Sequence, residues 1–430
     1  MNSYIYTLGC KVNQYESQAM AALLRRHGYC TATYHTGMEN VGEAVVIVNS
    51  CTVTGESDRK LRQLLRRIRR EQPQAVLVLT GCMPQAFPEA AAALNEADVV
   101  LGNARRHDVV EAIERFRSSG ERVVCITAHD RVIEPLCIED FDERTRAFVK
   151  VEDGCDRFCS YCIIPYARGR VRSRDPQAIV DELNTLVKAG YREVVLVGIN
   201  LTSYGKDTEL SLSDAVEAAA SVEGIERVRL GSLEPDHITD ELVARLGAVD
   251  KLCAQFHVAL QSGCDATLRR MNRHYDTAAF EAACDRLRAV FPEAVFTTDI
   301  MVGFPGETEE EFRQSLAFAT KIRFAKAHVF PYSRRRGTRA ATAPDQVDNA
   351  VKTDRAHRMG EACEAVRREI LNETVGTVQE VLCETRVSDG EAVGYTRGYL
   401  PCCLQGTVAA GETVTVTITH TDGERLFAAV

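Results

Sequence analysis

The sequence alternates short apolar runs with amphipathic stretches in two successive series, and this alternation limits the fold more than any other feature. In the first series, four apolar runs are typical of buried strands: Ser3–Leu8, Ala44–Val48, Ala75–Thr80 and Val99–Leu101. Two stretches between them, Glu16–His27 and Asp58–Arg70, have the periodicity of helices. Strands that alternate with helices pair in parallel, so we expect a parallel α/β sheet in an N-terminal domain of residues 1–135.

The second series begins at Ala147 and predicts a central domain of residues 141–371. Its six candidate strands are Phe148–Glu152, Glu193–Val197, Val228–Leu230, Phe256–Leu260, Val295–Ile300 and Ala327–Phe330. Helical patterns fill the gaps, for example Pro176–Ala189, and a long polar helix is expected over Asp345–Leu371. Six strand–helix units in succession favour a partial (β/α)6 barrel over an open sheet. The charged segment Thr127–Glu143 is predicted to link the two domains.

The last part of the chain changes character. Thr374–Cys383, Glu391–Arg397 and Thr413–Thr419 are short, rich in Val and Thr, and separated by Gly turns. This pattern predicts a small antiparallel β-barrel over residues 372–430. The expected fold class is therefore α/β, with two α/β domains followed by a β domain.

Composition excludes several classes of protein. No apolar stretch is long enough to span a membrane, and the N-terminus lacks the basic and apolar segments of a secretory signal. We therefore expect a cytoplasmic, monomeric protein without a membrane partner. The 16 cysteines of such a chain indicate reduced thiols, some of them metal or cluster ligands. The net charge of −9 argues only weakly against a nucleic-acid partner, because the distribution of charge matters more than its sum.

The most informative motif is GCDRFCSYC, residues 154–162, which follows the first strand of the second series. Its thiols, Cys155, Cys159 and Cys162, cannot complete a tetrahedral zinc site alone, and no fourth ligand is adjacent. An iron–sulfur cubane bound by three thiolates keeps one open iron, which suits the amino and carboxylate groups of S-adenosylmethionine. The alternatives are a zinc loop completed from elsewhere and cysteines that merely fill the core.

A second cysteine triad is dispersed along the first domain. Cys10, Cys51 and Cys82 each follow a predicted strand. The carboxyl ends of parallel strands meet at one edge of a sheet, so these three thiols are expected to converge there. They could hold a second cluster with an open iron, or they could be ordinary buried thiols.

Polar residues also follow the later strands of the second series, or lie near a strand end in the case of Asp299. They are candidates for cofactor binding because strand ends gather on one face of a barrel. These candidates are Asn200, Ser232, Glu234, Gln261 and Asp299.

The motifs together resemble the radical S-adenosylmethionine methylthiotransferase family over nearly the whole chain. They are TLGCKVNQYES (7–17), NSCTVT (49–54), GC (81–82), LQSG (260–263), MNR (271–273), DIMVGFPGET (299–308) and FPYS (330–333). The sequence around Cys10 is most similar to the branch that acts on N6-threonylcarbamoyladenosine in tRNA. The resemblance implies an N-terminal methylthiotransferase domain, a radical barrel and a C-terminal TRAM domain.

The resemblance also implies a reaction with two [4Fe-4S] clusters and S-adenosylmethionine. The cluster of Cys155, Cys159 and Cys162 would cleave S-adenosylmethionine to a radical that removes hydrogen from C2 of the adenine, and Tyr161 would lie beside the cofactor's adenine. The cluster of Cys10, Cys51 and Cys82 would hold the sulfur that is methylated and transferred. The implied partners are a tRNA anticodon stem–loop and reduced flavodoxin or ferredoxin. The open alternatives are the isopentenyladenosine branch, the branch that modifies a ribosomal-protein aspartate, and a non-catalytic iron–sulfur or zinc RNA-binding protein.

Basic residues lie near the proposed chemistry. Arg168 and Arg170 follow the cysteine loop, and Arg335 follows the last barrel strand. A guanidinium group is a bidentate partner for the carboxylate of a threonylcarbamoyl group, so these three are substrate candidates. The seven basic residues between Arg59 and Arg70 could contact phosphates or form a solvated helix face. The last domain, with three Arg, no Lys and eight acids, shows no phosphate-binding surface in its composition.

Overall fold

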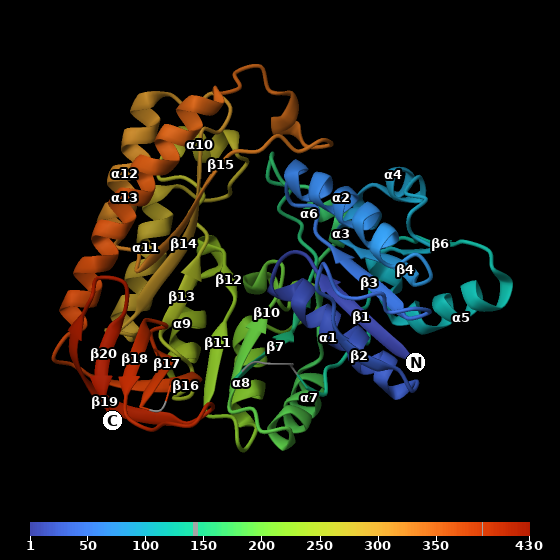
Figure 1. Cartoon of the computed structure of the whole chain (residues 1–430). Coiled ribbons are helices and arrows are strands. Elements are labelled where there is room, and N and C mark those ends of the chain that lie inside the picture. The colour runs from blue at the N-terminus through green and yellow to red at the C-terminus, as the bar shows by residue number, and fades with distance from the viewer. Residues whose placement is uncertain (141–144, 389) are drawn as a thin grey trace.

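The N-terminal region of the chain is one parallel six-stranded sheet in the order β2-β1-β3-β4-β5-β6 (Figure 1). The computed structural model describes residues 1–140, 145–388 and 390–430, so the predicted start of the second domain at residue 141 lies outside the described residues. The strands are β1 (Asn2–Thr7), β2 (Cys30–Thr33), β3 (Val45–Ser50), β4 (Val76–Gly81), β5 (Val99–Leu101) and β6 (Val123–Cys125). The parallel α/β sheet expected from the sequence is confirmed.

Helices cover the sheet and connect its strands. They are α1 (Lys11–Arg26), α2 (Gly55–Glu71), α3 (Cys82–Ala86), α4 (Pro88–Ala92), the 3₁₀ segment η1 (Asn103–Asp108) and α5 (Val109–Ser119). Helix α1 begins at Lys11 rather than at the predicted Glu16, because its first turn adds the apolar residues Val12 and Tyr15. These two side chains pack with the core of the central domain, whereas Met20 and Leu24 of the same helix pack on the N-terminal sheet.

The central region is a curved series of parallel strands in two sheets, β11-β10-β7 and β12-β13-β14-β15. The strands are β7 (Arg146–Lys150), β10 (Glu193–Val197), β11 (Arg227–Leu230), β12 (Ser232–Leu233), β13 (Gln255–Val258), β14 (Val295–Val302) and β15 (Lys326–Pro331). Gly231 separates β11 from β12, and an isolated bridge from Val228 to Leu252 continues the series across that break. Within the described residues β7 and β15 do not pair, so the barrel is partial and open between them.

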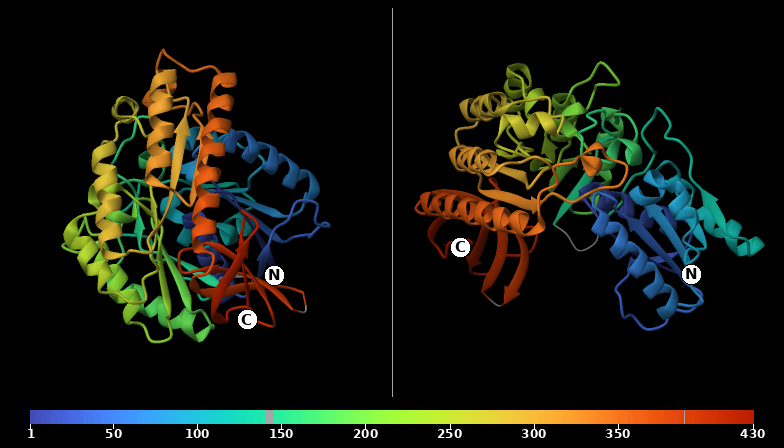
Figure 2. Two further views of the ribbon diagram at one scale, coloured as in Figure 1. Left: turned by 90° about the vertical axis from the view of Figure 1, so that its left-hand side faces the viewer. Right: turned by 90° about the horizontal axis from the view of Figure 1, so that it is seen from above.

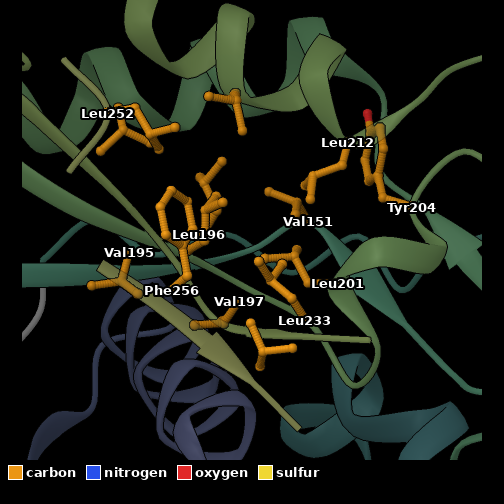
Figure 3. Close-up of a cluster of buried hydrophobic side chains, with 14 of the residues drawn as sticks. Val151, Val195, Leu196, Val197, Leu201, Tyr204, Leu212, Leu233, Leu252 and Phe256 are labelled. Atoms are coloured by element: carbon orange, nitrogen blue, oxygen red, sulfur yellow. The ribbon is translucent and has the colours of Figure 1, made fainter. Parts of the chain in front are cut away.

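Helices surround the outer face of the strand series, and Figure 3 shows part of the apolar core that the strands and helices share. They are α6 (Ile164–Arg168), α7 (Pro176–Lys188), α8 (Leu212–Ser221), α9 (Asp240–Gly247), α10 (Asp265–Arg270), α11 (Thr277–Val290), α12 (Glu309–Ile322) and α13 (Asn349–Thr374). Short segments complete the region: η2 (Leu201–Ser203), η3 (Pro235–His237), η4 (Arg339–Thr342) and the antiparallel pair β8 (Glu152–Asp153) with β9 (Arg172–Ser173). Among the described residues no helix combines the length and apolar character that crossing a membrane requires.

The C-terminal region is a closed barrel in the order β16-β17-β18-β20-β19. Its strands are β16 (Val378–Ser388), β17 (Glu391–Thr396), β18 (Pro401–Gln405), β19 (Thr413–Thr421) and β20 (Leu426–Ala429). The adjacent cysteines Cys402 and Cys403 lie on β18 and are both buried. The small antiparallel barrel expected from the sequence is confirmed apart from a parallel pairing of β18 with β20.

Acidic residues of the C-terminal barrel pair with arginines of the central strands. Glu380 lies 2.6 Å from Arg227, and Glu384 lies 2.7 Å from Arg146. Arg229 donates hydrogen bonds to the backbone carbonyls of Thr396 and Arg397. Part of the acidic excess of the last domain is therefore neutralised inside the molecule. Figure 2 shows the C-terminal barrel against one part of the central region and the N-terminal sheet against another.

Candidate metal centres and active site

Three cysteines converge at the carboxyl edge of the N-terminal sheet. Cys10 follows β1, Cys51 follows β3 and Cys82 follows β4, and these three strands are neighbours. The register pairs Thr7 with Asn49 and Ser50 with Gly81, so the chain leaves all three strands at the same level. The convergence that parallel pairing predicts is therefore present in the structure.

Close backbone packing forms this edge. Gly81 has φ +103°, and a Cβ atom there would lie 2.3 Å from the Ser50 carbonyl oxygen, so only glycine fits at the last residue of β4, directly before Cys82. The Cys10 thiol donates to Asn13 Oδ1 at 3.4 Å, and Asn103 donates to the Cys82 sulfur at 3.6 Å. Two asparagine side chains thus hold two of the three sulfur atoms in place.

The sulfur atoms of this triad influence one another's ionisation. Burial, together with the nearby sulfurs of Cys82 and Cys10, raises the pKa of Cys51 to about 12. Burial also raises the pKa of Cys10, against the opposing effect of the Arg168 guanidinium. The Cys10 residue as a whole is nevertheless exposed to solvent at this edge. Metal coordination would deprotonate such thiols.

The second triad lies on the loop that follows β7 and β8 of the central barrel. Gly154 begins the loop with φ +93°, and a Cβ atom there would collide with the Arg170 carbonyl. The Cys162 amide donates to the Cys159 carbonyl at 2.9 Å, which folds the loop back on itself. Burial raises the pKa of Cys155 to about 12 and also raises that of Cys162. Arg273 donates a hydrogen bond to the Cys159 sulfur at 3.2 Å.

The donor set fits iron–sulfur clusters. All six cysteines are free thiols, and each triad offers three thiolate ligands. No group of three or more His, Cys, Asp or Glu side chains within residues 1–140, 145–388 and 390–430 is arranged to hold a single metal ion. Near the second triad, Glu152 Oε1 and Asn200 Nδ2 are buried without a hydrogen-bond partner. Such atoms are available to a bound group at this position.

The predicted cofactor-binding residues form two groups, one beside the second cysteine triad and one along the barrel strands. Tyr161 lies in an aromatic cluster with Phe304, at 6.2 Å between ring centroids, and its pKa is raised by burial. Glu234 pairs with Arg273, the residue that donates to Cys159. These residues lie beside the second triad.

The other predicted cofactor-binding residues lie near the carboxyl ends of the barrel strands or in the barrel interior. Asn200 precedes η2, Ser232 begins β12, and Gln261 forms a bridge to Ile300 with φ +62°. Asp299 lies within β14 instead of at its end, and its Oδ2 atom is 3.5 Å from His257 Nε2. The structure thus groups Asp299 with histidines of the barrel interior rather than with the cysteine loop.

Two of the three predicted substrate-binding arginines have other partners. Arg168 is fully buried and donates to Glu16 at 2.5 Å and to Asn13 at 3.1 Å. Arg335 is 2% exposed and pairs with Asp58 at 2.6 Å, which joins the central region to α2. Both arginines therefore connect the central region to the N-terminal region.

Four arginines occupy alternate positions from residue 168 to residue 174, and they differ in exposure. Arg168, Arg172 and Arg174 are buried, whereas the Arg170 side chain is 88% exposed. The segment is not one extended strand, because Arg168 ends α6 and only Arg172 and Ser173 belong to β9. Of the three candidates, Arg170 alone remains available to a partner in solution.

The basic helix α2 is largely neutralised by carboxylates. Its ion pairs are Arg59 and Lys60 with Glu56, Arg66 with Glu96, Arg67 with Glu71, and Arg69 with Asp98. All four of these acids lie outside residues 59–70, one before and three after this basic run. The run alone therefore overstates the charge that this face offers to phosphates.

Some residues near the triads were not assigned a role from the sequence. Arg273 belongs to the MNR motif, and its contact with Cys159 depends on a fold that joins residues 114 positions apart. Asn103 and Asn13 contact sulfur atoms, and of these two only Asn13 lies within a recognisable motif. Lys11 directly follows Cys10, and burial together with the nearby Arg146 and Arg229 guanidinium groups lowers its pKa.

Family models match three parts of the chain. They are the radical SAM superfamily over residues 149–319, the uncharacterized protein family UPF0004 over residues 2–102 and the TRAM domain over residues 372–430. A solved radical S-adenosylmethionine methyltransferase, TsrM from Kitasatospora setae, has a TM-score of 0.58 at 14% identity and covers 79% of this chain and 74% of its own. At that identity the likeness concerns the fold alone.

Full-length relatives extend these matches. The chain is 38% identical to the threonylcarbamoyladenosine tRNA methylthiotransferase MtaB of Bacillus subtilis, over 94% of this chain and 90% of the relative. The corresponding protein of Thermotoga maritima is 37% identical over 92% and 89%. The tRNA-2-methylthio-N(6)-dimethylallyladenosine synthase of Clostridium novyi is 35% identical over 92% and 88%. With this similarity over nearly its whole length, the chain belongs to the radical S-adenosylmethionine methylthiotransferase family of transferases.

Proposed function

We propose that this protein transfers a methylthio group to C2 of N6-threonylcarbamoyladenosine 37 in tRNA, using two [4Fe-4S] clusters and S-adenosylmethionine. The observation that carries the proposal is the presence of two separate cysteine triads, one at the edge of the N-terminal sheet and one on the barrel loop. The names of the Bacillus subtilis and Thermotoga maritima relatives support the choice of nucleoside.

Each triad is assigned one cluster. Cys155, Cys159 and Cys162 would hold the cluster that binds S-adenosylmethionine, and the triad of Cys10, Cys51 and Cys82 would hold the second cluster. When bound, the cofactor supplies the radical that removes an unactivated hydrogen, and the second cluster supplies the sulfur. The proposed partners are a tRNA anticodon stem–loop and a reduced flavodoxin or ferredoxin, with a monomer acting in the cytoplasm.

Residues beside the barrel loop can bind the amino and carboxylate groups of the methionine moiety of S-adenosylmethionine. Arg273 can bind a carboxylate in a bidentate manner, and Glu234 can accept hydrogen bonds from an ammonium group. In the structure these two side chains pair with one another, so they are already close together and desolvated. Tyr161 and Phe304 add an apolar wall on the same side.

Each of the three domains would then have its own role in the reaction. We assign sulfur handling to residues 1–135, radical generation to residues 141–371 and RNA contact to residues 372–430. The ion pairs between the C-terminal barrel and Arg227 and Arg146 fix the last domain close to the barrel strands.

Dimethylallyladenosine is the second candidate substrate, because relatives such as that of Clostridium novyi carry this activity in their names. An isopentenyl group requires an apolar pocket. The barrel interior instead presents His257, Asp299 and His328 on neighbouring strands. These polar side chains favour a substituent that carries charge and hydrogen-bonding groups.

Nucleoside mass spectrometry of tRNA tests the choice of substrate. In cells that lack this protein and any paralogue, the 2-methylthio derivative of threonylcarbamoyladenosine is expected to disappear while unmethylthiolated threonylcarbamoyladenosine accumulates. Complementation with the wild-type gene should restore the derivative. Persistence of the derivative, or loss of the isopentenyl derivative instead, would refute the assignment.

Cys51→Ala separates the two proposed clusters. We expect the variant to keep cleaving S-adenosylmethionine, because the barrel triad is untouched, while methylthiolated nucleoside falls below detection. Liquid chromatography of 5′-deoxyadenosine and of digested tRNA measures both products in one reaction. The control is Cys30→Ala, which changes an exposed cysteine on β2 and should leave both products unchanged. Equal loss of both products in Cys51→Ala would contradict separate roles.

A further inference from the structure

The open side of the barrel brings together charged groups from distant parts of the chain. Strands β7 and β15 are the two ends of the described strand series, and α1 packs along β7. Lys11 is the first residue of α1; the residue is open to solvent, although the surrounding protein partly desolvates its ammonium group. Its Nζ atom lies 5.8 Å from the ring centroid of Phe148 on β7. The ammonium group of Lys11 therefore stands at the open edge of the barrel, directly after Cys10.

The opposite edge of the opening carries polar groups. The register of β14 and β15 pairs Asp299 with His328, so these two side chains point to the same face. His328 is exposed, and its ring lies 6.4 Å from the ring of His257, which in turn contacts Asp299. A carboxylate and two imidazole groups thus line the part of the barrel interior that is nearest to β15.

Lys11 differs from the other cations close to it because, among the described residues, it forms no direct ion pair, and the carboxylate that acts on it electrostatically is Asp299 across the opening. Arg229 donates to Glu193 at 2.6 Å, and Arg146 pairs with Glu384 at 2.7 Å. The contact of Lys11 that the structure shows is the one with the Phe148 ring. An accessible cation held over an aromatic ring and next to paired arginines is available to an incoming anion.

We propose that Lys11 binds the carboxylate of the threonylcarbamoyl group and that Asp299 accepts hydrogen bonds from the N–H or O–H donors of the same group. The inference rests on the proposed function, since it names the residues that read the substituent of that nucleoside. It places the substituent between α1 and β15, next to the sulfur-bearing edge at Cys10. Lys11 is thereby a specificity residue that contacts the substrate.

Binding of two RNAs to the anaerobically reconstituted full chain tests the proposal. One anticodon stem–loop carries N6-threonylcarbamoyladenosine, and the other carries its methyl ester, which lacks the negative charge. Wild-type protein is expected to prefer the carboxylate RNA, and Lys11→Gln is expected to lower this preference by about 10- to 100-fold. Lys11→Arg should keep most of it, because it keeps the positive charge.

The ratio of the two dissociation constants is measured on one preparation, so it does not depend on how much of the variant holds its clusters. Lys321→Gln removes an equal charge from α12, where Lys321 pairs with Glu281, and should leave the ratio unchanged. An unchanged ratio in Lys11→Gln would overturn the role of Lys11. If the wild-type protein itself bound threonylcarbamoyladenosine RNA no better than unmodified RNA, the proposed substrate would fail instead.

Discussion

Cys159→Ala is expected to abolish both 5′-deoxyadenosine formation and methylthiolation. Cys159 is buried in the barrel loop and accepts a hydrogen bond from Arg273, so alanine removes both a proposed cluster ligand and the acceptor of that bond. A cluster with two remaining thiolates would be lost, and iron per chain should fall to about half of the wild-type value. Iron analysis, electron paramagnetic resonance of the reduced protein and chromatography of the nucleoside products measure these three effects.

Cys264→Ala is the matched control for this variant. Cys264 is another buried cysteine of the central domain, and its thiol donates to Gln314. We expect the control to keep full iron content and 5′-deoxyadenosine formation with a small loss of stability. Wild-type product formation by Cys159→Ala, or equal iron loss in both variants, would disprove the assignment of the barrel triad.

Arg168→Met is expected to be the most destabilising substitution outside the cysteine triads. Arg168 is fully buried and bonds Glu16 of α1 and Asp153 of β8, so it joins the N-terminal region to the barrel. Removing one partner of such a buried network leaves carboxylates uncompensated, which costs ~3–5 kcal/mol. Lys150 and Arg106 also contact Glu16, so the lower end of that range is expected. Urea unfolding followed by circular dichroism measures the loss.

Arg170→Met provides the control two residues away. The Arg170 side chain is exposed and lies 3.9 Å from Asp156, so its loss should change the unfolding free energy by less than about 0.5 kcal/mol. Equal stability of Arg168→Met and Arg170→Met would show that the buried network does not hold the two regions together.

Much of the fold could be predicted from apolar periodicity. The predicted strand Glu193–Val197 coincides with β10, and the long helix predicted from Asp345 begins at Asn349, where Asp348 caps it through the Ala350 amide. Strands β2 and β18 were missed for a physical reason. β2 lies at the edge of its sheet and is mostly exposed, and β18 is a short run that begins with Pro401.

The candidate site could be predicted only where it follows strand ends. Cys10, Cys51 and Cys82 converge because three parallel strands end at one edge, which the sequence pattern already indicates. The buried state of Arg168 and Arg335 could not be foreseen, since arginine is ordinarily exposed and the partners lie far away in sequence. Asp58 and Arg335, for example, are separated by 277 positions.

The open side of the barrel also bears on the shape of the RNA. A base that reaches between Lys11 and His328 has to leave the stack of the anticodon loop and swing outward. Extruding a base costs a few kcal/mol, and less where its neighbours stack weakly. Two tRNAs with the same modified nucleoside would therefore react at different rates if their flanking bases stack differently. Selection among tRNAs could then arise from bases that the protein never touches.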